Sequence, residues 1–181
     1  MTGERVSRAR LRSAIRANDR RTAAVTGGMK ILLVCLGNIC RSPMAEAVVR
    51  SMLDNNGLAH ATVDSAGTHD FNVGLPPDPR ARLAALRRGY DMTGMRARQV
   101  QTADFADFDM ILAMDRRNLS VLESCCPAQH RHKLALFLGY AAGSDADEVP
   151  DPYGEPQEGF EPVLDLIEDA ARGLIEALRR T

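Results

Sequence analysis

The sequence predicts an α/β protein in which helices cover both faces of a parallel sheet. Four short apolar runs have the length of strands, and segments with the apolar spacing of helices lie between them. Strands that alternate with helices form parallel sheets through right-handed crossovers. Such strands are apolar along their whole length because both faces of the sheet are covered. At 181 residues, the chain is long enough for one domain with a sizeable core.

The first half of the chain supplies two strands and two helices. In chain order we expect a strand at 30–35, a helix at 43–53, a strand at 61–65 and a helix at 78–88. Gly57 favours the end of the first helix. Asp78 can cap the second helix, Pro79 suits its first turn, and Gly89 suits its end.

The second half supplies two further strands and two further helices. We expect strands at 109–114 and 133–138, and helices at 116–124 and 158–180. In the last helix, apolar residues from Phe160 to Leu178 recur at three- and four-residue spacing and fall on one face.

The first 28 residues differ from the rest in charge. Seven arginines against two acids give residues 1–28 a net charge of +5, so residues 29–181 carry −6 of the total of −1. The segment has no apolar core of a secretory signal, and Gly27-Gly28 marks a break before Met29. We expect residues 1–28 to be a disordered basic extension, or upstream sequence before a start at Met29. Residues 29–181 should form a single domain.

Composition argues against several classes of protein. No window reaches about 18 consecutive apolar residues, so membrane insertion is not expected, and the net charge of −1 indicates no nucleic acid. Adjacent Cys125 and Cys126 make a poor disulfide framework, and this favours a reducing, cytoplasmic setting. We expect both to be inert residues at a helix end. The chain has no C-x2-C pair for zinc and neither glycine-rich nucleotide motif.

The segment "CLGNICRS", residues 35–42, joins the first strand to the first helix. Gly37 and Asn38 tolerate positive φ, so the chain can curl there and turn its N–H groups inward. With the N-terminus of the helix, these groups form a cradle for an anion. Arg41 adds a planar, charged fork that suits two oxygens of a phosphate. The expected ligand of this loop is therefore a phosphoryl group.

Cys35 lies where the positive field of the loop is strongest. The field favours the thiolate, which is the nucleophilic form. Ser42 can donate a hydrogen bond to that thiolate and help it to leave later. The other interpretation, a buried structural cysteine, leaves Arg41 without an anion.

These residues resemble the signature of the low-molecular-weight protein tyrosine phosphatases. The resemblance begins with "VCLGNICRSPMAEAV" at 34–48. It continues in order through "DSAGT" at 64–68, "PPDPRA" at 76–81, "ARQV" at 97–100, "FDMILAMDRRNL" at 108–119 and "VPDPYG" at 149–154. It covers about residues 29–181. It implies a three-layer α/β/α fold with a four-stranded parallel sheet of order 2-1-3-4 and a phosphate loop after the first strand.

The resemblance also implies a reaction. Cys35 would attack phosphorus to form a phosphocysteine, and Arg41 would hold the phosphoryl oxygens through the transition state. Asp151 would protonate the leaving phenolate and then activate a water; from the residues alone, its "DP" segment is more often only a turn. No metal or other cofactor is implied. The implied partner is a phosphotyrosine protein, with a tyrosine kinase among the possible ones, and the implied state is a monomer.

Further site residues follow from the same resemblance. The rest of the phosphate-binding loop comprises Leu36, Gly37, Asn38, Ile39, Cys40 and Ser42. Ser65 would bond to Asn38 and support the loop, as would Asp115, which precedes a helix and suits its N-cap. Phe71 and Tyr153 would flank the phenyl ring of the substrate; the alternative is that each pins its own loop.

Three further positions bear on the redox behaviour, the rigidity of the loop and the substrate. Cys40 either forms a reversible disulfide with Cys35, as a cysteine here can do in the family, or only lines the cradle. Met95 stands where many relatives carry a histidine that braces the loop. Ile39 stands where a related branch that acts on phosphoarginine carries threonine, and so favours phosphotyrosine.

Two other functions share parts of this pattern. An arsenate reductase of the same fold also uses C-x5-R, but it needs further cysteines that relay a disulfide outward, which adjacent Cys125 and Cys126 fit poorly. A phosphotyrosine-binding module without turnover has only Met95 in its favour. Asp151 favours a phosphatase over both.

Overall fold

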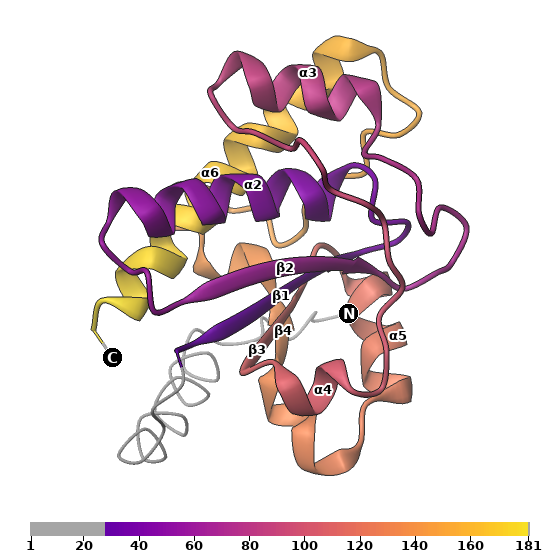
Figure 1. Cartoon of the computed structure of the whole chain (residues 1–181), viewed down its shortest axis with the longest axis vertical. Coiled ribbons are helices and arrows are strands. Elements are labelled where there is room, and N and C mark those ends of the chain that lie inside the picture. The colour runs from indigo at the N-terminus through magenta and orange to yellow at the C-terminus, as the bar shows by residue number, and fades with distance from the viewer. Residues whose placement is uncertain (1–27, 181) are drawn as a thin grey trace.

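Four parallel strands form the central sheet of the structure, a computed structural model that describes residues 28–180 (Figure 1). Their order, β2-β1-β3-β4, confirms the expected 2-1-3-4. The expected basic extension, residues 1–28, lies outside the described residues apart from Gly28. The strands are β1 (Lys30–Cys35), β2 (Thr62–Gly67), β3 (Met110–Ala113) and β4 (Leu134–Leu136).

The central strand β1 is buried on both faces, which explains its unbroken apolar sequence. Ile31 and Leu33 pack into a core on one face of the sheet, and Leu32 and Val34 pack into a second core on the other. This alternation follows from the period of two in a strand. The strand ends at Cys35, which therefore lies at the carboxyl edge of the sheet.

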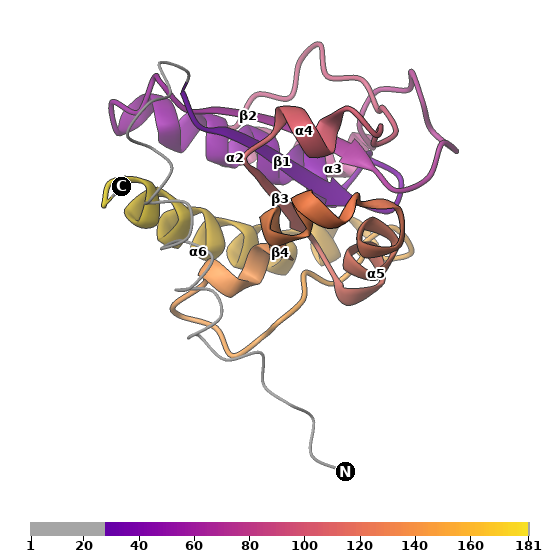
Figure 2. The same ribbon diagram turned by 90° about the horizontal axis from the view of Figure 1, so that it is seen from below.

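Helices cover both faces of the sheet and confirm the three layers (Figures 1 and 2). α2 (Arg41–Asn55), α3 (Pro79–Arg87) and α6 (Phe160–Leu178) lie on one face, and α4 (Asp104–Asp107) and α5 (Arg116–Cys125) lie on the other. The single turn α4 was not predicted, because one turn is too short to show a helical period. Within residues 28–180, every helix is too short or too polar to cross a bilayer.

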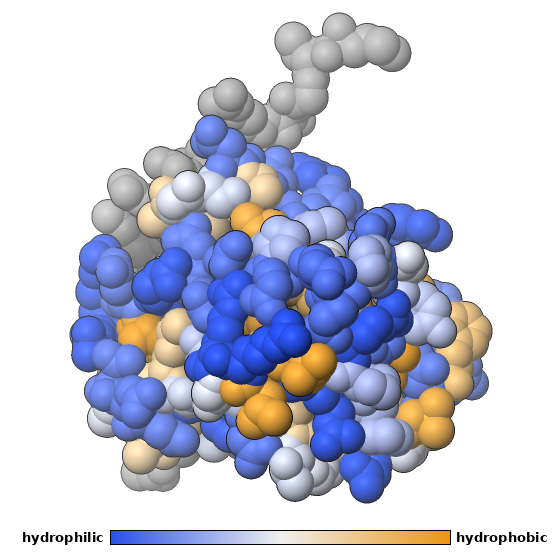
Figure 3. Space-filling view, turned by 90° about the horizontal axis from the view of Figure 1, so that it is seen from above, coloured by the Kyte–Doolittle hydropathy of each residue, from blue (hydrophilic) through white to orange (hydrophobic). Residues whose placement is uncertain are grey.

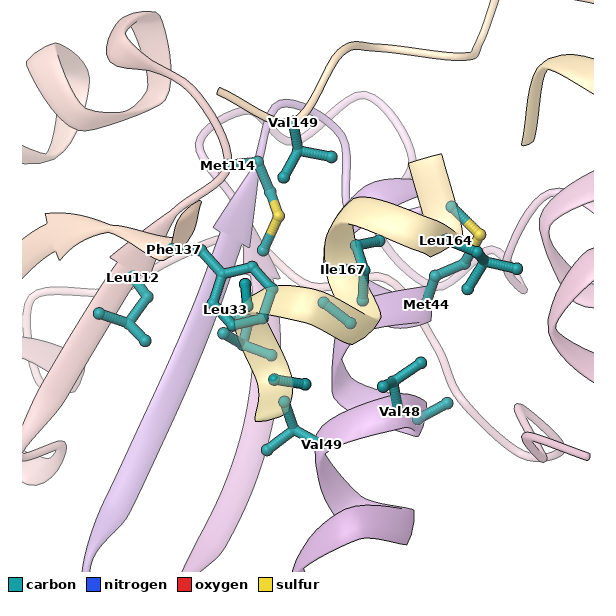
Figure 4. Packing of buried hydrophobic residues seen from close by; sticks show 14 of the residues in the cluster. Leu33, Met44, Val48, Val49, Leu112, Met114, Phe137, Val149, Leu164 and Ile167 are labelled. Carbon is teal, nitrogen blue, oxygen red and sulfur yellow. The ribbon is translucent and has the colours of Figure 1, made fainter. Parts of the chain in front are cut away.

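The larger core lies between the sheet and the pair α2 and α6 (Figure 4). Phe137 is fully buried there near Leu33 and Leu112, and Ile167 of α6 belongs to the same cluster. Full burial of such a side chain stabilises the fold by roughly 1.5–3 kcal/mol. This packing holds the start of α2 at a defined position over the end of β1.

The segment predicted as a strand at 133–138 is shorter than expected. It begins within the 3-10 helix η2 (Ala128–Lys133), continues as β4, and ends in the 3-10 helix η3 (Phe137–Tyr140). Its buried apolar residues, Phe137 and Leu138, lie in the helical turn η3, whereas the three residues of β4 are half-buried. Periodicity cannot separate these two states in so short an apolar run.

Two helices begin at other residues than predicted. The helix expected at 43–53 begins at Arg41, so its first turn is part of the loop that follows β1. The helix expected at 158–180 begins at Phe160, because the preceding turn is the 3-10 helix η4 (Gln157–Gly159).

Helix α3 begins and ends as the sequence predicts. The Asp78 carboxylate accepts a hydrogen bond from Arg80 N–H at 2.8 Å, and Gly89 adopts a φ of 83° after the helix.

Figure 3 looks onto the side of the molecule that carries α3, where the surface is mostly hydrophilic with small apolar groups. Leu83 and Leu86 are the exposed apolar side chains of α3.

Candidate active site

Three residues from distant parts of the sequence lie together at the carboxyl edge of the sheet. Cys35 ends β1, Arg41 begins α2, and Asp151 lies in the segment that leads to η4 and α6. Arg41 Nη2 donates to Asp151 Oδ2 at 2.9 Å. The structure thus brings together the cysteine, the arginine and the aspartate that the sequence indicated.

The chain between Cys35 and Arg41 curls at Asn38. Asn38 is the only non-glycine residue with positive φ in the described part of the chain, at 54°. Gly37, beside it, allows a close approach, because a Cβ there would lie 2.5 Å from Nδ2 of Asn72. The Asn72 amide instead donates to the Gly37 carbonyl at 3.1 Å. Asn38 therefore bends the loop as expected, whereas Gly37 has no positive φ and instead allows the close approach of Asn72.

The carbonyl groups of the loop accept hydrogen bonds from donors outside the loop. Thr68 N donates to Cys35 O at 2.9 Å, His69 N to Leu36 O at 3.0 Å, Asn72 Nδ2 to Gly37 O at 3.1 Å, Asp78 N to Ile39 O at 2.8 Å and Met44 N to Cys40 O at 3.1 Å. These bonds fix the orientation of the peptide planes. They leave the N–H side of the loop for an anion, in the manner of a nest of amides.

Helix α2 adds its own N-terminus to this cradle. Its N-cap residue, Cys40, makes no side-chain capping bond. The first N–H groups of a helix have no partner within the helix and carry partial positive charge. The start of α2 is therefore suited to hold a phosphoryl group next to Cys35.

The Cys35 thiol is buried and hydrogen-bonded within the loop. Only 3% of the residue is exposed. A hydrogen bond of 3.1 Å joins Cys35 Sγ to Ser42 Oγ, and Asn38 N–H donates to Sγ at 3.3 Å. Both contacts can stabilise negative charge on the sulfur.

Arg41 is a buried cation that is shared between two carboxylates. Its Nη1 donates to Asp115 Oδ2 at 2.5 Å and to the Val149 carbonyl at 3.2 Å, while Nη2 reaches Asp151. Burial acts against the charged form, but the negative charges of Cys35, Asp115 and Asp151 raise the pKa of Arg41. The guanidinium is thus held in one plane with a permanent charge.

Asp115 serves two structural purposes. It caps α5 as predicted, since Asn118 N–H donates to its Oδ1 at 2.7 Å. Its other oxygen holds Arg41. The neighbouring groups favour the orientation in which the Asn118 amide nitrogen faces Asp115. In it, buried Asn118 donates to Asp115 Oδ1 at 3.0 Å and accepts from Leu36 N–H at 3.3 Å. Sequence analysis missed Asn118, which connects α5 directly to the loop.

The Asn38 side chain is the centre of a network that holds the loop. Its Nδ2 donates to Ser42 Oγ and to Ser65 Oγ, both at 2.9 Å, and its Oδ1 accepts from Arg98 N–H at 2.9 Å. The contact with Ser65 is the predicted one. Arg98 was not predicted, although it lies in the "ARQV" motif; its guanidinium is held by Asp64 at 2.8 Å and by an aspartate of α4.

Glu46 extends this network and was also missed. Ser65 Oγ donates to Glu46 Oε2 at 2.6 Å, and Arg50 pairs with the other carboxylate oxygen. Burial raises the pKa of Glu46, against the hydrogen bond from Ser65. Met95 packs against the larger core. The loop is therefore braced by a buried carboxylate on α2 and by backbone of the 97–100 segment.

The other predicted side chains lie around this cradle. Phe71 and Tyr153 are exposed by 69% and 61%, and Phe71 stacks on His69 with ring centroids 4.9 Å apart. Leu36 is exposed at the loop, and Ile39 is half-buried. Phe71 and Tyr153 are accessible to a substrate, while the stacking shows that Phe71 also contacts its own loop.

The cysteines other than Cys35 are free thiols of low acidity. Cys40 belongs to the same core cluster as Cys35, and burial, assisted by Asp78, raises its pKa. Burial also raises the pKa of Cys125, the last residue of α5, and of Cys126, which follows it. Among residues 28–180, no three His, Cys, Asp or Glu side chains gather as ligands of a metal would.

Known proteins match this chain along nearly the whole described part. A family model described as low molecular weight phosphotyrosine protein phosphatase matches residues 30–181. A putative low molecular weight protein-tyrosine-phosphatase of Synechocystis is 47% identical over 152 residues, which cover 83% of this chain and 96% of the relative. The low molecular weight protein-tyrosine-phosphatase YfkJ of Bacillus subtilis is 39% identical, with coverage of 84% and 97%.

A solved structure is similar as well. The crystal structure of a protein tyrosine phosphatase from Entamoeba histolytica, with Hepes in the active site, superposes with a TM-score of 0.82 at 41% identity. The match covers 84% of this chain and 98% of that one. Fold and sequence therefore agree over the same residues.

The buried carboxyl of Glu46 should make stability depend on pH. Because its pKa is raised on folding, the folded state binds this proton more tightly than the unfolded chain does. That stability is present below the ordinary glutamate pKa and is lost as the pH rises through the folded-state pKa. In Glu46→Gln this loss is absent, so its free energy of unfolding relative to wild type should increase as the pH rises above the ordinary glutamate pKa of about 4.3.

Urea denaturation at several pH values measures this difference. The exposed Glu123→Gln is the matched control, and its unfolding free energy should follow that of wild type. Equal pH slopes for wild type and Glu46→Gln would contradict the prediction.

Proposed function

The chain belongs to the low molecular weight phosphotyrosine protein phosphatase family and is a protein-tyrosine phosphatase, and we propose that its activity rests on Cys35, Arg41 and Asp151. One observation carries the assignment. A single guanidinium, that of Arg41, contacts Asp151 directly and lies in the loop of the hydrogen-bonded Cys35. A nucleophile, an anion-binding group and a proton donor thus meet at one point, as phosphoryl transfer requires.

In the first step, the Cys35 thiolate attacks the phosphorus of a phosphotyrosine bound in the loop. The new sulfur–phosphorus bond forms as the bond to the phenolic oxygen breaks. Asp151 gives its proton to that oxygen, so that the product leaves as a neutral phenol. Arg41 and the loop amides bear the charge on the three phosphoryl oxygens.

In the second step, water hydrolyses the phosphocysteine. Asp151, now a carboxylate, takes a proton from the attacking water, and the new oxygen–phosphorus bond displaces the Cys35 thiolate. Ser42 Oγ, 3.1 Å from the sulfur, can donate a hydrogen bond to the leaving thiolate. Inorganic phosphate is released and the enzyme returns to its starting state.

Arg41 also connects the phosphate-binding loop to Asp151. In the structure, Asp151 Oδ2 accepts a hydrogen bond from Arg41 Nη2 at 2.9 Å. A phosphoryl group held by Arg41 competes for this donor and brings negative charge close to the carboxylate. Binding of the phosphoryl group therefore loosens the contact between Arg41 and Asp151.

The substrate class follows from the rim and from the family. Exposed Phe71 and Tyr153 can flank a phenyl ring, and Leu36 and Ile39 add apolar wall. The proposed partner is a phosphotyrosine protein, with a tyrosine kinase as one candidate. We also propose a reducing, cytoplasmic setting, which the four free cysteines support.

The arsenate reductase alternative has little support in the geometry. Cys125 and Cys126 lie at the end of α5, and Asp115 caps the start of the same ten-residue helix. At 1.5 Å per residue, the helix separates them from the site by about 15 Å. Cys40 is the cysteine nearer to Cys35 in the fold, since both belong to one core cluster.

Cys35→Ser should abolish turnover of an aryl phosphate such as para-nitrophenyl phosphate. A hydroxyl in place of the thiolate is a far weaker nucleophile at neutral pH, and no phosphoenzyme can accumulate. Steady-state release of the phenol measures this, with Cys125→Ser as the control that should keep full activity. Turnover that survives in Cys35→Ser would sink the proposed nucleophile.

Asp151→Ala should lower kcat on phenyl phosphate by roughly 10²–10⁴-fold, because phenolate is a poor leaving group without a proton donor. Binding of inorganic phosphate should change far less. Equal losses in turnover and in phosphate affinity would count against the general-acid role. The same variant can retain phosphotyrosine substrates from a lysate.

A chain that begins at Met29 should fold and keep its activity. The family model starts at residue 30, and the sheet, both cores and the site are built from residues 28–180. Thermal unfolding and turnover of phenyl phosphate, compared with the full chain, check this. A shortened chain that fails to fold would show that residues 1–28 belong to the domain.

A further inference from the structure

We propose that Arg80 is a positioning residue for the phosphatase reaction, which holds the segment that carries Asp151 against the phosphate loop. The proposal rests on the role of Asp151 proposed above and goes beyond it. Arg80 lies in the first turn of α3, one of the helices that cover the sheet. Its side chain joins three separate parts of the fold.

The first part is the segment that carries Asp151. Arg80 Nη2 donates to the Tyr153 carbonyl at 2.9 Å, and Nη1 donates to the Glu155 carbonyl at 2.7 Å. Tyr153 N–H in turn donates to Asp151 Oδ1 at 3.2 Å. Arg80 thus grips the backbone just after the aspartate. Of residues 151–155, only Pro152 is buried, so apolar packing does little to hold this segment.

The second part is the phosphate loop. Arg80 makes a two-pronged contact with Asp78, through Nε to Oδ1 at 3.0 Å and Nη2 to Oδ2 at 2.8 Å. Asp78 N–H donates to the Ile39 carbonyl at 2.8 Å. The hydrogen bond from Arg80 lowers the pKa of Asp78, which keeps this carboxylate ionised in weakly acidic solution. The contacts therefore run without a gap from the loop to the segment of Asp151.

The third part is the start of α6, which Figure 1 shows beside α3. The Arg80 guanidinium lies 5.0 Å from the ring centroid of buried Phe160 and 5.8 Å from that of Tyr153. A cation over the face of an aromatic ring is stabilised by its attraction to the ring electrons. Gln157 Nε2 donates back to the Arg80 carbonyl at 3.1 Å. The Arg80 side chain thus also contacts the ring of Tyr153, which we place at the substrate rim.

Only an arginine can make this set of contacts. The planar fork presents five N–H donors at fixed angles, and here they meet one carboxylate and two carbonyls at once. A lysine keeps the charge but offers one compact ammonium. Proton transfer requires hydrogen-bond reach between acid and leaving oxygen, so even a small displacement of Asp151 should slow the first step.

The test is the dependence of kcat/KM on the leaving group, which reports the first chemical step. Wild type, Arg80→Ala, Asp151→Ala and the double variant are compared on phenyl phosphate and on 2,4-dinitrophenyl phosphate. Dinitrophenolate leaves readily without a proton, so it bypasses the acid. Arg82→Ala, an exposed arginine of the same helix, is the matched control, and circular dichroism with thermal unfolding verifies the fold of each variant.

We expect Arg80→Ala to lose about 10- to 100-fold in kcat/KM on phenyl phosphate and less than about threefold on the dinitrophenyl ester. Inhibition by inorganic phosphate should stay within about twofold. Because Arg80 acts through Asp151, the double variant should be no slower than Asp151→Ala. Arg80→Lys, which keeps the charge and the stem over Phe160, should show the same selective loss and replaces Arg80→Ala if that variant unfolds.

Two results separate the two proposals. If Asp151→Ala loses rate selectively on phenyl phosphate but the Arg80 variants lose equally on both esters, or add fully to Asp151→Ala, the positioning role is overturned and the general acid stands. If Asp151→Ala itself shows no selectivity between the esters, the general acid is overturned and the role of Arg80 falls with it.

Discussion

The buried guanidinium of Arg41 is the group around which the site is arranged. A cation with 4% of its side chain exposed must be paired, since an unpaired buried charge is strongly unfavourable. Its partners come from the start of α5, from the Val149 carbonyl and from Asp151. Satisfying one charge therefore draws the ends of two strands and a distant connecting segment to the same edge of the sheet.

The phosphate loop is rigid for a related reason. Its carbonyl groups accept hydrogen bonds from residues outside the loop. The Asn38 side chain uses its amide nitrogen and its amide oxygen to hold a left-handed turn. Throughout the described residues, every buried side-chain nitrogen and oxygen has a hydrogen-bond partner. A fully satisfied polar network specifies one geometry, and a preorganised geometry is what stabilises a phosphoryl transition state.

The sequence predicted the parts of this structure that depend on local pattern. The apolar strand Lys30–Cys35 was found residue for residue, because an unbroken apolar run of this length that ends at a turn signal favours a strand buried on both faces. The caps Asp78 and Asp115 were found because capping chemistry is local. The end of β4 was wrong and α4 was missed, because runs of three or four residues carry no period that separates a strand from a turn.

The sequence by itself determined the chemistry of the first loop: a cysteine, an arginine and the asparagine that bends the chain, all within residues 35–41. Only the tertiary structure decided what braces and aims that chemistry. Glu46, Arg98 and Arg80 are ordinary surface-type residues in the sequence, and each also contacts a segment that is 19 to 75 residues away. Such contacts leave no local pattern, because they depend on how helices cross the sheet rather than on the spacing of residues along the chain.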